Sequence, residues 1–259
     1  MTRNVCIIPA RMQSSRFPGK PLKPLLGLPL ILHIYERCRR YDGFERTVVA
    51  TCDAEIKTVV ENHGGQAVMT ADTHERCTDR VEEALANLRL DLADADLVVM
   101  VQGDEVLVSP EMIAGVMAAQ ERTGAEVVNL GSRLYRAEDH EDPNTVKMVA
   151  APDGRGLFFS RAPIPSRARA EDAPAYQQTG IMAFTYRFLK RFSRLSPTPL
   201  EIAESVDMLR VIEHGLPLYA VFTEKETLGV DTEADLKRGE EMLAADPFTA
   251  QYLDRKNWP

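Results

Sequence analysis

The stretch IIPARMQSSRFPGKPL, residues 7–22, changes from apolar to polar and basic along its length. It begins inside an apolar run, residues 4–10, which is typical of a strand buried on both faces. It continues as a polar loop that carries Arg11, Arg16 and Lys20. Loops of this kind follow the strands of parallel sheets, where the carboxyl ends form the ligand-binding edge. The stretch therefore predicts an α/β fold with a cationic site after its first strand.

The rest of the first half repeats this alternation of strand and helix. Short apolar strands alternate with segments of helical period, which implies right-handed crossovers and a mainly parallel sheet. The expected strands are residues 47–51, 67–70 and 96–101, and the expected helices are residues 30–40, 55–62 and 78–90.

From residue 126 the alternation of strand and helix gives way to strands joined by longer, proline-containing loops. We predict one domain over residues 1–259 with an inserted antiparallel portion at about residues 130–190. The polar loop at residues 160–178 is long enough to be functional or an interface. The expected later elements are strands at 127–134, 145–151, 157–159, 180–184 and 218–222, a helix at 203–214, and a last helix from 232 or 233.

Composition excludes several classes of function. The 259 residues carry 31 basic and 39 acidic side chains, and the net charge of -8 argues against a general nucleic-acid surface. No apolar run approaches the roughly 20 residues that span a bilayer, and the start lacks the features of a signal peptide. The four cysteines have no C-x-x-C spacing, so neither a disulfide framework nor a zinc site is expected. These observations predict a cytoplasmic protein.

The cationic loop is interpreted as a phosphate site. Arg11, Arg16 and Lys20 repel one another unless an anion lies between them, and backbone N–H groups beside Ser14 and Ser15 could donate to phosphate oxygens. The spacing matches neither the P-loop nor the dinucleotide-binding pattern. A solvated basic loop is the alternative.

Carboxylates follow two other strands of the expected sheet. Asp104 and Glu105 end the run VQGDE, and Asp231 follows a strand-like segment in GVDTEADL. A carboxylate that faces phosphates needs a metal between them, and Mg²⁺ takes one or two carboxylates together with phosphate oxygens. Alternatively, Asp231 only helps to cap the helix that begins beside it.

Five motifs in order give the chain a resemblance to the Kdo cytidylyltransferase family, whose acceptor Kdo is an eight-carbon deoxy sugar acid. They are IIPARMQSSRFPGKPL, THERCTDR, VMVQGDE, LFFSRAPIP and LGVDTEADL. The resemblance implies a Rossmann-like nucleotidyltransferase that forms a homodimer through the inserted portion. It also implies a reaction in which CTP and an anionic acceptor give a CMP conjugate and pyrophosphate, with one or two Mg²⁺ ions as cofactor.

The resemblance also implies a role for each matched residue. Asp104 and Asp231 would bind Mg²⁺, and together with Lys20 and Arg11 they form the expected catalytic set. His74 is expected to be structural or to contact the ligand-binding residues from behind, rather than to be catalytic. The nucleotide would be bound by Arg11, Ser14, Ser15, Arg16, Lys20, Thr78, Asp79, Arg80 and Gln102, and the acceptor by Arg76, Gln102, Arg161, Gln178, Met182 and Asp207.

The departures from the family pattern fall on the acceptor side. The chain reads QTGIMAF where the family usually reads HIGIYAY, which places Gln178 at the histidine and Met182 at the first tyrosine. Asp207 replaces a glutamate, and Arg76 adds a cation. These changes favour a phosphonate or another non-Kdo acid as the acceptor. A genuine Kdo enzyme and an inactive nucleotide-binding homologue are the alternatives.

We predict that CTP stabilises the protein more than UTP, ATP or GTP does. At 100 times its dissociation constant, CTP would add about 2.7 kcal/mol to the free energy of unfolding, which corresponds to a rise of roughly 5–10 °C in Tm. Thermal-shift titrations with each nucleotide and Mg²⁺ measure this. Equal shifts with ATP or GTP would contradict a preference for CTP.

Overall fold

The computed structural model describes residues 2–13 and 17–254. Within these ranges nine strands form one sheet, which runs in the order β11-β7-β10-β6-β1-β4-β5 with β8 and β9 attached through β10. At its centre, β1 (Asn4–Ala10) pairs in parallel with β4 (Arg46–Thr51) and β6 (Leu97–Val101). The other strands of the row are β5 (Ala67–Met69), β7 (Val127–Arg133), β10 (Tyr176–Thr185) and β11 (Tyr219–Thr223).

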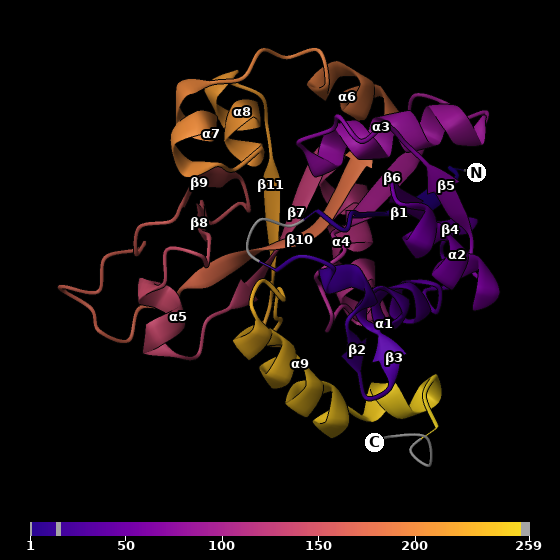
Figure 1. Ribbon diagram of the computed structural model, residues 1–259. Helices are drawn as coiled ribbons and strands as arrows, with labels where there is room; N and C mark the ends of the chain where they lie inside the picture. The colour runs from indigo at the N-terminus through magenta and orange to yellow at the C-terminus, as the bar shows by residue number, and fades with distance from the viewer. Residues whose placement is uncertain (1, 14–16, 255–259) are drawn as a thin grey trace.

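Helices cover both faces of the sheet (Figure 1), and each face has its own apolar core. Alternate residues of β1 point to opposite cores: Cys6 and Ile8 to one, Val5 and Ile7 to the other. The first face is covered by α1 (Leu30–Cys38), α2 (Ala54–Asn62), α4 (Pro110–Thr123) and α9 (Glu233–Ala245). The second is covered by α3 (Cys77–Leu88), α6 (Tyr186–Phe192) and α8 (Met208–Glu213).

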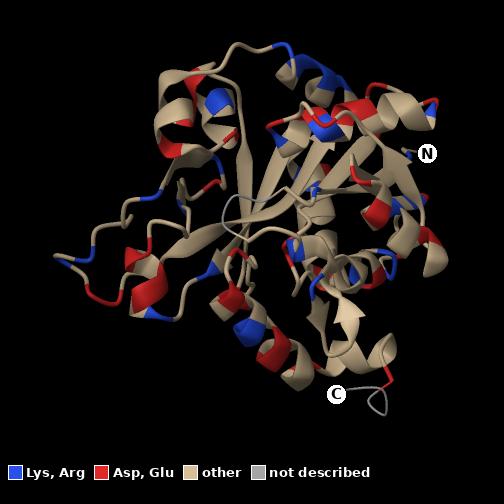
Figure 2. Ribbon diagram, in the orientation of Figure 1, with Lys and Arg blue, Asp and Glu red and all other residues tan. Residues whose placement is uncertain are grey.

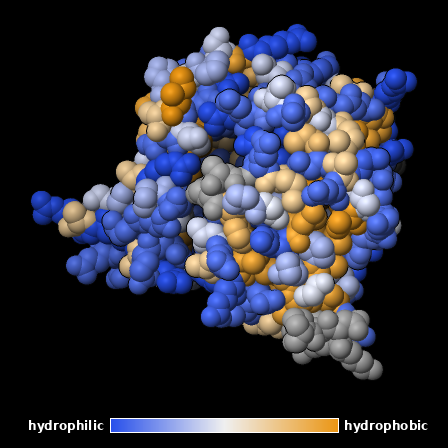
Figure 3. Space-filling view, in the orientation of Figure 1, coloured by the Kyte–Doolittle hydropathy of each residue, from blue (hydrophilic) through white to orange (hydrophobic). Residues whose placement is uncertain are grey.

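Between β7 and β10 the chain leaves the main body and returns. It forms α5 (Ala137–Glu141) and the antiparallel pair of β8 (Lys147–Ala150) and β9 (Gly156–Ser160). β10 then runs back into the central sheet, antiparallel to both β6 and β7. The predicted mainly parallel α/β fold with an antiparallel insertion is confirmed. In Figure 3 the surface of this insertion is mostly hydrophilic.

The helices α4, α5 and α6 were not among the expected elements, and two of the expected elements have clearly different bounds. The expected helix over residues 203–214 is split into α7 (Pro199–Glu204) and α8, because Ser205 adopts a left-handed backbone with φ 53°. The expected strand at 180–184 begins earlier, at Tyr176, because Tyr176 and Gln177 pair with β8. Such pairing between distant segments leaves no periodic signal in the polar sequence around residue 177.

Three short elements complete the described part of the chain. The pair β2 (Pro24–Leu25) and β3 (Leu28–Pro29) follows the 3₁₀ helix η1 (Lys20–Leu22). A second 3₁₀ helix, η2 (Pro247–Gln251), lies beside α1, and the buried Arg37 of α1 reaches Asp246, the N-cap of η2, at 2.5 Å. On the face shown in Figure 2, acidic and basic side chains are interspersed over the helices. No helix in the described ranges is long and apolar enough to cross a membrane.

Gly103 lies where the turn after β6 touches the end of β1. A Cβ atom built on Gly103 would lie 2.7 Å from the backbone oxygen of Pro9. We expect Gly103→Ala to lower the free energy of unfolding by about 1–3 kcal/mol, because backbone must move to relieve the overlap. Gly115→Ala on α4 is the control, since nothing lies within 4 Å of its added methyl group. Urea unfolding of the two variants measures the difference, and equal stabilities would contradict the steric argument.

Candidate active site

The cationic loop after β1 folds back so that Lys20 points into the protein. Gly19 adopts φ 73°, a conformation that favours glycine, and its N–H donates to the oxygen of Met12 at 2.9 Å. Lys20 opens η1 directly after this turn and is only 8% exposed. The predicted ligands Ser14, Ser15 and Arg16 lie outside the described residues.

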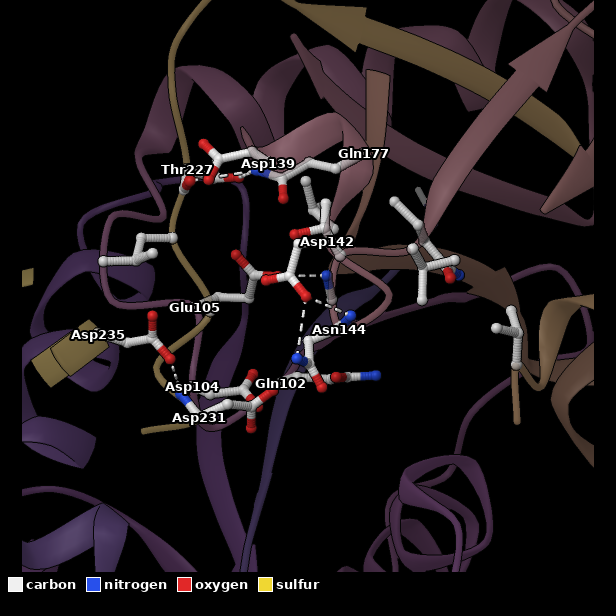
Figure 4. Close-up of a pocket in the computed structure, with 18 of the residues that line it drawn as sticks. Gln102, Asp104, Glu105, Asp139, Asp142, Asn144, Gln177, Thr227, Asp231 and Asp235 are labelled. Atoms are coloured by element: carbon white, nitrogen blue, oxygen red, sulfur yellow. Dashed lines mark hydrogen bonds between the residues drawn. The ribbon is translucent and has the colours of Figure 1, made fainter. Parts of the chain in front are cut away.

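Asp104 and Asp231 are brought together by a short backbone pairing. The turn after β6 forms an antiparallel bridge between Glu105 and Gly229, and the N–H of Val230 donates to the oxygen of Asp104 at 3.1 Å. Val230 is fully buried in the first core. The pairing therefore fixes two carboxylates side by side at the carboxyl edge of the sheet (Figure 4).

Lys20 lies between these two carboxylates. Its Nζ is 3.1 Å from Asp104 Oδ2 and 3.1 Å from Asp231 Oδ1. Burial alone would lower the pKa of Lys20, but the charges of Asp104 and Asp231 outweigh it and raise that pKa above its ordinary value. The helix cap is made instead by Thr232 and Asp235, so the side chain of Asp231 is not the cap of α9.

Glu105 is a buried carboxyl group beside this centre. Burial, followed by the charge of Asp104, raises the pKa of Glu105 to about 8. Its Oε1 accepts the N–H of Gly180 at 2.5 Å, and its Oε2 has no hydrogen-bond partner among the described residues. Glu105 therefore carries a proton at neutral pH, and the two carboxylates that bond to Lys20 are those of Asp104 and Asp231.

A cleft with two lobes opens at this edge of the sheet. The first lobe, of about 290 Å³, lies over the loop after β1, and the second, of about 340 Å³, lies between β10, α8 and the insertion. Arg76, Gln102 and Asp104 line both lobes, so the two are continuous. Figure 4 shows the second lobe, with Asp104 and Asp231 at one end and Gln177 and Thr227 at the other.

Several predicted nucleotide ligands line the first lobe. They are Arg11, Lys20, Arg80 and Gln102. Arg11 is exposed, and its guanidinium donates to the oxygen of His74 at 3.2 Å. Arg80 is 3% exposed and donates to Thr70 Oγ1 at 2.5 Å, so it supports the wall of the lobe.

The other two predicted nucleotide ligands lie beside the cleft rather than on its described lining. Thr78 is buried and donates to Asp207 Oδ2 at 3.3 Å. Asp79 lies in the first turn of α3 and is half-buried. The bond from Thr78 joins the start of α3 to Asp207, a contact that the motif alone could not distinguish from a ligand contact.

The predicted acceptor residues all line the second lobe, although most of them already have protein partners. These residues are Arg76, Gln102, Arg161, Gln178, Met182 and Asp207. Arg76 Nη1 lies 3.0 Å from Asp207 Oδ1, so Arg76 is not the uncommitted cation that the sequence suggested. Arg161 Nε donates to the oxygen of Glu204 at 2.6 Å, and Gln178 Nε2 donates to Asn129 Oδ1 at 2.8 Å.

The sequence analysis missed a group of residues that the insertion and the segment before α9 bring to the second lobe. Arg238 of α9 bonds to Glu226 at 2.5 Å and to Asp139 of α5 at 3.3 Å across this wall. The other missed lining residues include Asp142, Asn144, Gln177, Thr227 and Asp235. Asp142, Asn144 and Thr227 lie in loops, where no hydrophobic period marks a side chain as facing a cleft. Gln177 of β10, adjacent to Gln178, and Asp235, inside the motif LGVDTEADL, had a signal in the sequence.

The carboxylate pair fits the requirements of a Mg²⁺ site. The two oxygens already hold one cation, the ammonium of Lys20, between them. Among the described residues no group of three or more His, Cys, Asp or Glu side chains could hold a metal. A metal bound here would therefore need further ligands, and Mg²⁺ commonly takes these from water and substrate phosphates.

Comparison with known proteins agrees with this geometry. The family model described as cytidylyltransferase matches residues 5–226. A 3-deoxy-manno-octulosonate cytidylyltransferase of Syntrophobacter fumaroxidans is 45% identical over 251 residues, which cover 96% of this chain and 100% of the relative. The chain belongs to the cytidylyltransferase family. The match to the family model ends before Asp231.

Two further relatives extend the comparison. An 8-amino-3,8-dideoxy-manno-octulosonate cytidylyltransferase of Shewanella sp. (strain ANA-3) is 40% identical over 93% of this chain and 98% of its own length. A solved CMP:2-keto-3-deoxy-manno-octonic acid synthetase, complexed with CTP, superposes with a TM-score of 0.85. It is 34% identical, and the match covers 94% of this chain and 99% of that one. The Rossmann-like nucleotidyltransferase fold is thus shown.

We predict that Glu105 makes the protein less stable as the pH rises. Between about pH 4.5 and 8 the folded protein keeps a proton on Glu105 that the unfolded chain has lost. The free energy of unfolding therefore falls across this window, by at most roughly 1.4 kcal/mol per pH unit, and this contribution is constant below it.

Urea unfolding of Glu105→Gln at pH 5, 6.5 and 8 tests this dependence. The neutral amide should match the wild type at pH 5 and be more stable than it at pH 8. Glu121→Gln, at an exposed position on α4, is the control and should follow the wild type throughout. A parallel decline in Glu105→Gln and the wild type would show that Glu105 does not cause the dependence.

Proposed function

We propose that this cytidylyltransferase transfers CMP from CTP to an eight-carbon sugar acid of the Kdo type and releases pyrophosphate. The observation that carries the proposal is the position of Lys20, Asp104 and Asp231 where the two lobes of the cleft meet. One lobe would hold the nucleotide and the other the acceptor, so that the reacting atoms meet beside these three side chains. The relatives that act on Kdo and 8-amino-Kdo support this acceptor class.

The mechanism follows from the charges that must meet. A hydroxyl oxygen of the acceptor attacks the α-phosphorus of CTP and its proton passes to water. The bond to the β-phosphate breaks, and pyrophosphate leaves with the electron pair. Arg11 and Lys20, on the first lobe, would bind the triphosphate and stabilise the charge on the leaving group. Gln102, on both lobes, is placed to contact either substrate.

Mg²⁺ held by Asp104 and Asp231 would neutralise phosphate charge and make the attacking hydroxyl more acidic. We propose Mg²⁺ as the cofactor because both carboxylates are present, adjacent and partly exposed, at 25% and 27% of their side-chain surface. The same pair argues against the inactive homologue, which would not need to keep two carboxylates beside a phosphate-binding lysine.

The second lobe suits a polyol acid better than a compact anion. Its lining combines amides, carboxylates and paired guanidinium groups, among them Asn144, Gln177 and Gln178. Such groups read hydroxyl groups by hydrogen bonds, whereas a small phosphonate would need an unpaired cation. Because Arg76 is paired with Asp207, a phosphonate becomes the second candidate. The phosphonate is still favoured by Met182, which replaces the tyrosine that is usual in the family.

We also infer that the enzyme acts as a homodimer. The resemblance implies this assembly, and an exposed apolar residue of the insertion supports it. Among the described strands β9 pairs in a ladder with β8, and outside that ladder the N–H of Gly156 donates to the oxygen of Leu218 at 2.8 Å. Leu157 of β9 is 49% exposed. Sedimentation velocity tests the assembly, and a monomer at micromolar concentration would contradict it.

Pyrophosphate release with CTP and a panel of acceptors tests the proposed reaction. Kdo, 8-amino-Kdo, a compact phosphonate and no acceptor form the four arms. We expect Kdo or 8-amino-Kdo to reach a kcat/KM of about 10⁴ M⁻¹s⁻¹ or more, which is the ordinary enzymatic range. Faster turnover of the phosphonate would restore the second candidate, and no release in any arm would indicate the inactive homologue.

We predict that Asp104→Asn and Asp231→Asn each lower kcat by roughly 10²–10⁴-fold. Each substitution removes a ligand charge without changing the shape of the side chain, and the loss of metal stabilisation is several kcal/mol. Asp42→Asn, at an exposed position between α1 and β4, is the control. Pyrophosphate release at saturating Mg²⁺ and thermal unfolding separate lost turnover from lost folding. Near-normal kcat in either cleft variant would remove that residue from the catalytic set.

A further inference from the structure

The ammonium group of Lys20 occupies the space between the two carboxylates that the proposed reaction assigns to Mg²⁺. Its distances to Asp104 and Asp231 are equal at 3.1 Å, so the charge is shared by both. The Lys20 side chain is 11% exposed, less than either carboxylate. The cation is therefore enclosed between its partners, and a divalent ion that bound the same two oxygens would meet it at close range and be repelled.

Lys20 also lines the lobe assigned to the nucleotide. Its four-carbon side chain can move the ammonium group from the carboxylates to an adjacent phosphate by rotation about its own bonds. A bound triphosphate would replace the carboxylates as the anionic partner of Lys20. Mg²⁺ would replace the ammonium group as the cation between the two carboxylates. Each charge remains compensated before and after the exchange.

We propose that Lys20 is an electrostatic latch, which holds the metal position closed until a triphosphate draws its ammonium group away. Metal and nucleotide binding are then coupled, because each favours the position of Lys20 that the other needs. The small number of protein ligands at the site strengthens this coupling, since the phosphates must complete the coordination. The inference rests on the proposed function in assigning the first lobe to CTP.

Binding of Mn²⁺ to the nucleotide-free protein, measured by electron paramagnetic resonance of the free ion, tests the latch. Lys20→Met removes the charge and keeps most of the volume, and we expect it to bind Mn²⁺ at least about tenfold more tightly than the wild type. Lys20→Arg keeps a cation and should bind as weakly as the wild type. Lys20→Gln, also neutral, must show the same gain as Lys20→Met, so the test does not depend on one variant folding.

Two controls assign the gain to this site. Lys23→Met removes an exposed lysine of the same loop, whose Nζ lies 5.6 Å from the centre of the Phe17 ring, and it should leave Mn²⁺ affinity unchanged. Adding Asp104→Asn to Lys20→Met should abolish the gain, because a ligand of the proposed metal is lost. Unchanged Mn²⁺ affinity in both neutral variants would overturn the latch, as would the same gain in Lys23→Met.

These outcomes are separate from the outcome of the acceptor assay. If the wild type transfers CMP but neither neutral variant binds Mn²⁺ more tightly, the latch is wrong and the proposed function stands. If no acceptor is used and the neutral variants still gain affinity, Lys20 closes a metal site whose reaction is a different one. Thermal unfolding adds an independent readout, because Mn²⁺ should raise the Tm of Lys20→Met more than that of the wild type.

Discussion

The backbone bridge between Glu105 and Gly229 is the constraint on which the site depends. It joins the turn after β6 to the segment before α9, and so places Asp231 beside Asp104. Two adjacent carboxylates in a half-buried cleft repel each other unless a cation lies between them. The ammonium of Lys20 fills this role in the structure, and it does so because Gly19 turns the loop inward. Three segments far apart in the sequence are thereby held in one electrostatic arrangement.

Much of the fold could be predicted because its central strands are buried on both faces. Such strands appear as continuous apolar runs, and β1, β4 and β6 formed where the sequence indicated. The position of the candidate site followed from the rule that ligands bind at the carboxyl ends of parallel strands. The roles assigned to Lys20, Asp104 and Asp231 are still predictions, but the proximity that those roles require is present.

The contacts in the second lobe of the cleft could not be predicted, because they depend on pairing between side chains rather than on the hydrophobic pattern of the sequence. The sequence shows Arg76 as an added cation, and in the structure Arg76 forms an ion pair with Asp207. The break between α7 and α8 at Ser205 is equally hidden, since serine does not usually take a left-handed backbone. A sequence motif identifies which residues share a site, whereas only coordinates show which of them are already partnered.

The pairing of Arg76 with Asp207 belongs to a larger ionic cluster. Glu201 is fully buried on α7, bonds to Arg210 of α8 at 2.5 and 2.7 Å, and lies 3.9 Å from Arg76. Removing one member of a buried ionic group costs several kcal/mol, because its partner is left uncompensated. A substitution at Arg76 or Asp207 would therefore disturb the junction of α7, α8 and the start of α3 as well as the lining of the second lobe. The shape of that part of the cleft and the stability of this corner of the protein depend on the same side chains.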